Sequence, residues 1–202
     1  MSLQNGLIHK GRAYLWSDTL AIDDEGKPAG YCSKAYHGLE WPWAAIHSGH
    51  LRNADPHRVG RAIGLNKPRN GAELIAAAVA TLRAERADGL IGRLLLAYAD
   101  KAEGVRMFFI ANDETPFAAP FEPHETVQFA CGHSDDHWST AFVDRDLTHL
   151  EMREFIAEQA KRPMLTVFGK EQWGIGGELI ETRVTKAGVR SVSLRLLDPA
   201  AA

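Results

Sequence analysis

The stretch KGRAYLWSDT, residues 10–19, decides the fold of this chain. It opens with a Lys-Gly turn, continues through the apolar and aromatic run of residues 13–16, and ends in Ser-Asp-Thr. A short apolar run between turn residues predicts a buried β-strand. Because residues 7–9 have the same character just before the turn, the two segments together predict an N-terminal hairpin.

Further strands are expected on both sides of a helical centre. Asn70, with Glu73 three residues later, predicts the start of a helix over residues 72–86. Thr148 and Glu151 form a second capping pattern, whose helix should continue until Pro163 stops it. The expected strands are residues 7–9, 13–16, 31–36, 43–47, 94–98, 107–110, 126–131, 179–184 and 189–197.

This order of elements predicts an α+β fold. Strand blocks at both ends, with amphipathic helices between and after them, favour two antiparallel sheets packed face to face and flanked by helices, a four-layer αββα sandwich. The chain has 202 residues, of which 45% are hydrophobic and 24% charged, so we expect a single domain over residues 1–202.

The charge pattern excludes several classes of partner. The formal net charge is −3 and the basic residues are scattered, so neither nucleic acid nor an anionic membrane surface is an expected partner.

Cys32 and Cys131 lie far apart, which favours neither a disulfide framework nor a paired-cysteine zinc motif. With no leader pattern and no apolar run of ~18 residues, the sequence predicts a cytoplasmic protein without a membrane span.

Three chemically useful side chains recur at equal spacing near the chain start. Asp18 follows Ser2 by 16 positions, and Lys34 follows Asp18 by 16. Removal of the initiator Met would leave the Ser2 hydroxyl beside a free α-amine, whose ordinary pKa is ~7.7 to 8.0. Such an amine can deprotonate its own hydroxyl, which predicts an N-terminal nucleophile.

These segments resemble the proteasome β-type subunits and the bacterial HslV peptidase, which are N-terminal-nucleophile hydrolases. Residues 10–19 are similar to the opening of that family, with its Lys-Gly turn, apolar strand and Asp-Thr end. Residues 33–34 resemble its lysine strand, residues 43–49 its apolar strand ending in glycine, and residues 176–189 its closing hairpin. The resemblance extends over nearly the whole chain.

The resemblance implies a mechanism and a set of partners. Ser2 falls at the position of the nucleophile, Asp18 at that of the aspartate that orients the lysine, and Lys34 at that of the lysine, while Gly49 would supply the oxyanion N–H. The implied reaction is hydrolysis of peptide or amide bonds through an acyl-enzyme, without a cofactor. The implied substrates are peptides or unfolded proteins, handled by a homo-oligomer in rings or stacks with an ATP-dependent unfoldase as a further partner.

Around the nucleophile the chain departs from the family pattern. The family has Gly-Ser-Gly after its central strand, whereas this chain has CGHSD over residues 131–135, so His133 and Ser134 become the candidates for supporting groups. Ahead of the closing glycines, Glu171 is the candidate for the supporting acid, after a shift of one residue.

Alternative interpretations stay open. The altered supporting groups also fit a non-catalytic subunit of the same fold, with a structural or binding role. The histidine-rich segment over residues 131–137 allows a metal-dependent hydrolase, although its spacing favours a loop leading into a helix. Asp18 alone is also typical of a turn aspartate bonded to nearby backbone N–H groups. The tryptophans at positions 16, 41, 43 and 173 fit a packed core better than a substrate cleft.

Overall fold

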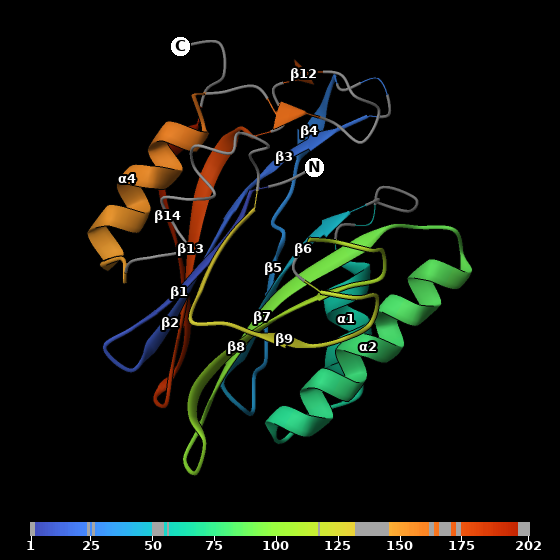
Figure 1. The fold of residues 1–202 in the computed structure, drawn as a ribbon, viewed down its shortest axis with the longest axis vertical. Helices are drawn as coiled ribbons and strands as arrows, with labels where there is room; N and C mark the ends of the chain where they lie inside the picture. The colour runs from blue at the N-terminus through green and yellow to red at the C-terminus, as the bar shows by residue number, and fades with distance from the viewer. Residues whose placement is uncertain are drawn as a thin grey trace.

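The computed structural model describes residues 3–23, 25, 27–49, 55, 57–116, 118–131, 146–161, 164–165, 171–172 and 175–197. These residues form two five-stranded sheets, two two-stranded sheets and three helices (Figure 1). Each recorded strand pair is antiparallel. The fold is therefore α+β with antiparallel sheets, as the order of elements predicts.

The first sheet contains the N-terminal hairpin and has the strand order β10-β1-β2-β13-β14. Lys10 and Gly11 connect the two strands of this hairpin, and both have positive φ, at 49° and 68°. Positive φ at both central residues is the geometry that suits a two-residue turn between twisted antiparallel strands. The strands are β1 (Gln4–His9), β2 (Arg12–Asp18), β10 (Gln128–Cys131), β13 (Gly177–Thr185) and β14 (Gly188–Leu197).

The second large sheet has the order β5-β6-β7-β8-β9. Its strands are β5 (Ala35–His37), β6 (Trp43–Gly49), β7 (Gly92–Asp100), β8 (Gly104–Ala111) and β9 (His124–Glu125). The two-stranded sheets pair β3 (Leu20–Ile22) with β4 (Pro28–Tyr31), and β11 (Met164–Leu165) with β12 (Glu171–Gln172).

The helices are α1 (Arg58–Leu65), α2 (Gly71–Ala87) and α4 (His149–Gln159). Asn70 caps α2, because its side chain accepts a hydrogen bond from Glu73 N. Thr148 and Glu151 form a reciprocal capping box at the start of α4. Both caps agree with the sequence patterns, and both satisfy backbone N–H groups that have no partner inside the helix. In the described part of the chain, no helix is long and apolar enough to cross a membrane.

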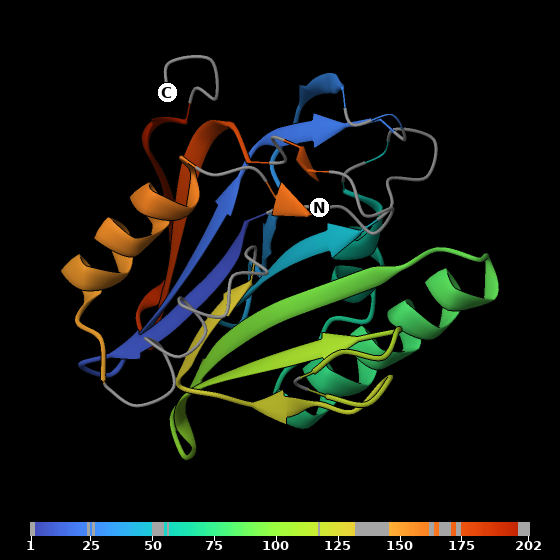
Figure 2. The same ribbon diagram turned by 45° about the horizontal axis from the view of Figure 1, so that its top comes forward.

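Three apolar clusters separate the layers. One, which includes Leu15, Ile46 and Phe109, lies between the two large sheets. A second fills the space between the β5–β9 sheet and helices α1 and α2, and a third lies between the first sheet and α4. Figure 2 shows α4 against the outer face of the first sheet and α1 with α2 against the other sheet. Trp43 and Trp16 belong to the second and third clusters, so both pack in the core, as predicted.

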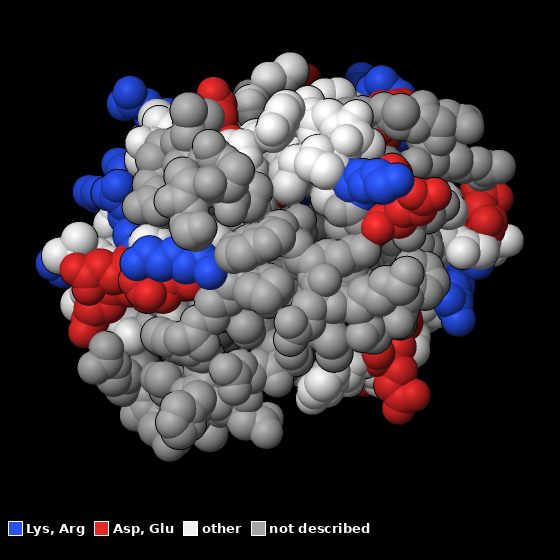
Figure 3. Space-filling model, turned by 90° about the horizontal axis from the view of Figure 1, so that it is seen from above, with Lys and Arg blue, Asp and Glu red and all other residues white. Residues whose placement is uncertain are grey.

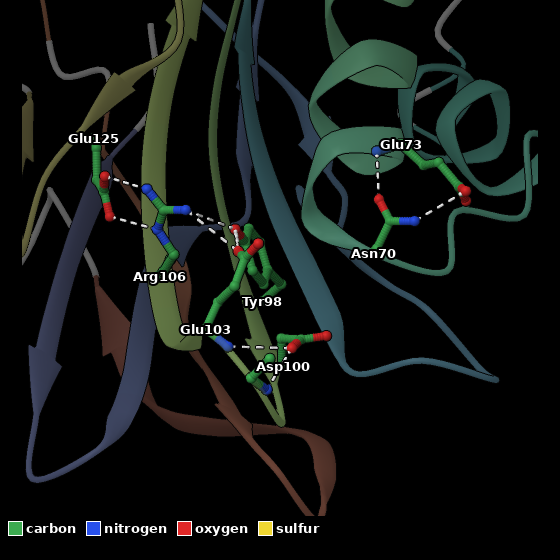
Figure 4. A network of polar contacts seen from close by, with 8 residues as sticks. Asn70, Glu73, Tyr98, Asp100, Glu103, Arg106 and Glu125 are labelled. Atoms are coloured by element: carbon green, nitrogen blue, oxygen red, sulfur yellow. Dashed lines mark hydrogen bonds and ion pairs between the residues drawn. The ribbon is translucent and has the colours of Figure 1, made fainter.

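A network of polar contacts lies at the turn end of the β7–β8 hairpin (Figure 4). Arg106 donates two hydrogen bonds to the Glu125 carboxylate, at 2.7 and 2.5 Å, which ties β9 to β8. The Tyr98 hydroxyl donates a hydrogen bond to the Glu103 carboxylate at 2.5 Å. Burial is the larger cause that raises the pKa of Tyr98 to about 12, and this hydrogen bond is the second. Asp100 accepts from the backbone N–H of Ala102 in the turn. These contacts connect β9 and the turn after β7 to the β7–β8 hairpin.

Some sequence expectations are wrong in detail. Residues 31–36 do not form one strand, because β4 ends at Tyr31 and β5 begins at Ala35 in a different sheet. Helix α1 was not expected, since its glycines and its length of eight residues weaken the helical pattern. Helix α4 ends at Gln159, before Pro163 is reached. The other expected strands and α2 lie where the patterns predict, to within a few residues, whereas the short strands β3, β9, β11 and β12 are not among the expected ones.

Candidate active site

Asp18 and Lys34 meet in a buried ion pair. Asp18 is the last residue of β2 and is fully buried, and Lys34 lies just before β5 with 5% of its surface exposed. The Lys34 ammonium donates to Asp18 Oδ1 at 2.7 Å. The structure therefore brings together two of the side chains that the equal spacing singled out.

Backbone groups complete the coordination of this pair. The N–H of Leu3 donates to Asp18 Oδ1 at 3.0 Å, and the N–H of Gly176 donates to Asp18 Oδ2 at 3.2 Å. Lys34 Nζ also donates to the Leu20 carbonyl oxygen at 2.6 Å. The two N–H donors lie 15 and 158 positions from Asp18 in the sequence. Asp18 is therefore a long-range anchor, not the local turn aspartate of the alternative interpretation.

The extra hydrogen bonds explain how two charges are accommodated in the interior. Burying an ion pair costs desolvation free energy that the mutual attraction offsets only with good geometry and additional hydrogen bonds. Here each carboxylate oxygen of Asp18 has a donor. An ammonium has three N–H donors, and two of those on Lys34 have acceptors among the described residues.

Three segments hold the pair in place. Thr19 Oγ1 accepts from Glu178 N at 2.9 Å, which fixes the end of β2 against the start of β13. The Thr19 carbonyl accepts from Cys32 N at 2.8 Å. The Lys34 carbonyl in turn accepts from His47 N at 3.0 Å, which ties the lysine to β6.

Gly49 occupies the end of β6, with Gly92 as its Cα partner on β7. Its φ is 156°, and a Cβ atom placed on it would clash with the carbonyl oxygen of Ile91. Close approach of the neighbouring strand is therefore sufficient reason for glycine at this position. The oxyanion role that the resemblance implies for Gly49 stays a prediction.

Cys32 lies in the electric field of the ion pair. Burial raises the pKa of its thiol, the positive charge of Lys34 lowers that pKa by a smaller amount, and the negative charge of Asp18 raises it further. A raised pKa keeps the sulfur protonated, and the thiol is a much weaker nucleophile than the thiolate. Cys32 is therefore a poor candidate for the nucleophile of this site.

The other predicted site residues are not part of the described geometry. Ser2, His133 and Ser134 lie outside the described residues. Glu171 belongs to β12, where its backbone pairs with Leu165, but its side chain is outside the described part. Within the described ranges, no group of three His, Cys, Asp or Glu side chains could hold a metal ion.

Sequence reasoning missed the backbone partners of the pair. Leu3 and Gly176 donate through N–H groups, and Leu20 accepts through its carbonyl. Every residue has a backbone carbonyl and every residue except proline has a backbone N–H, so residue type carries almost no signal for them. Gly176 was singled out only as part of the closing hairpin, although its N–H reaches the carboxylate directly.

Figure 3 shows the molecule from above, the end at which Figure 1 places β3 and β4. On the described part of this face, basic and acidic side chains lie interspersed around the edge and are not gathered by sign. No family model matches the chain, and no curated protein matches it.

Proposed function

We propose that this protein is an N-terminal-nucleophile hydrolase, a peptidase or amidase built on the four-layer αββα sandwich of that class. One observation carries the proposal: the buried Asp18 carboxylate binds both the Lys34 ammonium and the N–H of Leu3, the first described residue. The ion pair is thereby tied to the start of β1. An N-terminal nucleophile needs a fixed positive charge nearby, and a lysine held by the carboxylate that also binds the N–H of Leu3 supports that role.

The chemistry follows from the roles of four residues. The Ser2 hydroxyl oxygen attacks the carbonyl carbon of the substrate while its proton passes to the α-amine of the same residue. The Lys34 ammonium stabilises the negative charge that develops on the hydroxyl oxygen, and Asp18 holds the ammonium in place. The α-amine then protonates the leaving amine, and water hydrolyses the acyl-enzyme ester. An N–H at Gly49 would stabilise the oxyanion, a contribution of about 3 to 4 kcal/mol in known cases.

The resemblance also brings proposals about partners and location. Peptides or unfolded proteins are the proposed substrates, and a cytoplasmic homo-oligomer with an ATP-dependent unfoldase is the proposed assembly. Enclosing the nucleophile in such an assembly would restrict hydrolysis to chains that can enter it. The proposed homo-oligomer is tested by measuring the molar mass of the purified protein, because a monomer at working concentration would contradict it.

The first prediction concerns the nucleophile. The purified protein should lack Met1, and incubation with a β-lactone should then add one acyl group to Ser2, as measured by intact-mass spectrometry. Ser2→Ala should abolish the adduct, because no hydroxyl is left to acylate, whereas Ser2→Thr should retain it. Lys34→Met should lower the acylation rate by about 100-fold or more, since it removes charge stabilisation.

Controls separate chemistry from folding. Lys27 is an exposed lysine, with 71% of its side chain accessible, so Lys27→Met should acylate at the wild-type rate. Melting temperatures of all variants show whether lost acylation reflects unfolding. An adduct that persists in Ser2→Ala would contradict the nucleophile assignment, and activity lost on adding a chelator would favour the metal-dependent alternative.

A further inference from the structure

Gln4 bridges the two large sheets beside the candidate site. It is the first residue of β1, directly after Leu3, and it is fully buried. Its side-chain Nε2 donates to the carbonyl oxygen of Ile46 at 2.9 Å and to that of Arg93 at 3.0 Å. Ile46 belongs to β6 and Arg93 to β7, so one amide group connects the start of the first sheet to two strands of the second.

The orientation of this amide follows from its partners. Carbonyl oxygens only accept hydrogen bonds, so the group that faces them is the NH₂ and not the oxygen. Gln4 Oε1 therefore points away from Ile46 and Arg93. It is buried and has no hydrogen-bond partner in the described part of the chain.

Such a side chain is not what stability alone favours. A buried amide oxygen without a partner costs free energy, and a residue of similar volume without polar atoms avoids that cost. The amide binds Gln4 to Ile46 of β6, and Ile46 lies three positions before Gly49 on that strand. On the other side, Leu3 is held by Asp18. The chain start is thus fixed at two consecutive residues, once to the ion pair and once to the strand that ends in Gly49.

We propose that Gln4 is a positioning residue, which sets the start of the chain relative to β6 and so aligns the nucleophile with the oxyanion-binding strand. The catalytic part of this inference rests on the proposed function. The amide binds backbone carbonyl groups of β6 and β7, and its effect is transmitted through the backbone of Leu3. A misplacement of about 1 Å between reacting groups is enough to lower a rate by about 100-fold.

The test compares Gln4→Met with a matched control on the same strand. Methionine has nearly the same volume as glutamine and lacks the amide. The control is Asn5→Leu, because Asn5 is equally buried and donates to Gln159 Oε1 at 2.5 Å, which ties β1 to α4 instead of β6. Acylation of each variant by a β-lactone is measured over a range of concentrations, together with its melting temperature.

Gln4→Met should lower the maximal acylation rate by about 100-fold while the half-saturating lactone concentration stays unchanged, since positioning and not binding is lost. Asn5→Leu should keep the maximal rate and lose at least as much thermal stability. Wild-type acylation in Gln4→Met overturns the inference. The inference is also overturned if the acylation rate falls in proportion to the melting temperature, and to the same extent, in both variants.

Hydrogen exchange of the Leu3 amide supplies a readout that needs no catalysis. Its protection should fall in Gln4→Met, because the anchor beside it is lost, and should persist in Asn5→Leu. Unchanged protection in Gln4→Met overturns the positioning role. If wild-type protein is not acylated at Ser2 but Leu3 loses protection in Gln4→Met, the proposed function fails and the positioning of the chain start stands.

Discussion

His47 is a buried histidine on β6 whose surroundings disfavour its charged form. Its ring lies beside Gly92 and Leu82, close enough that a Cβ on Gly92 would touch both side chains. Among the described residues, its Nε2 atom has no hydrogen-bond partner. Burial, then the positive charges of Arg58 and Lys34, lower the pKa of His47 from 6.5 to about 4. The ring is therefore neutral in the folded protein at neutral pH.

A lowered pKa predicts acid sensitivity. Between pH 6.5 and about 4, the unfolded chain binds a proton at His47 that the folded protein does not bind, so the free energy of unfolding falls as the pH falls. The full effect is about 3 kcal/mol. His47→Leu should flatten the dependence of unfolding free energy on pH in this window, as measured by denaturant unfolding. Parallel curves for wild type and variant would contradict the prediction.

At the scale of elements, caps decide where α2 and α4 begin. The Thr148 capping box satisfies two backbone groups at the start of α4, and this helix covers the outer face of the first sheet. Met152 and Phe155 are the inner residues of α4, and both pack in the third cluster. The cap thus begins the helix whose residues Met152 and Phe155 pack against the first sheet.

Thr148→Ala should lower the free energy of unfolding by about 1 kcal/mol, because the N–H of Glu151 loses its acceptor. Leu150→Ala is the control in the same turn, since Leu150 is 63% exposed and should change stability little. Chemical denaturation of the two variants gives the comparison. Equal losses would show that the first turn of α4 is stabilised by something other than its cap.

In the molecule as a whole, the two large sheets pack closely against each other at Gly6 of β1. A Cβ atom on Gly6 would come within 2.5 Å of the Met107 sulfur and 2.8 Å of a Leu95 methyl carbon. Gly6 lies on β1, while Leu95 and Met107 lie on β7 and β8. A side chain at this position would therefore clash with side chains of the other sheet.

Gly6→Val should destabilise the protein by about 1 to 3 kcal/mol, because buried side chains of both sheets must move. A second change, Met107→Ala, makes room and should recover part of the loss.

Gly64→Ala is the opposite case, since nothing lies within 4 Å of a Cβ there and the residue is helical. It should stabilise the protein by about 0.5 to 1 kcal/mol, and thermal unfolding measures all three.

Much of the fold was predictable because its signals are local. Asn70 and Thr148, each with a glutamate three residues later, predict helix starts from four consecutive residues. The Lys10-Gly11 turn predicts the first hairpin in the same local way. Helix α1 is not predicted by its sequence, because two glycines interrupt a pattern of only eight residues. The side chains of residues 31–36 do not indicate that the chain moves from one sheet to another after Tyr31.

For the site, residue types and spacing were enough to single out Asp18 and Lys34, because a carboxylate and an ammonium at strand ends are recognisable in the chain itself. Their burial, and the bonds from Leu3 and Gly176, arise only when β2, β13 and the start of β1 come together. The Gln4 bridge likewise depends on how two sheets pack. Local patterns specify caps, turns and strands because those depend on neighbours in sequence, whereas contacts between distant backbone groups depend on register and packing, which no single stretch encodes.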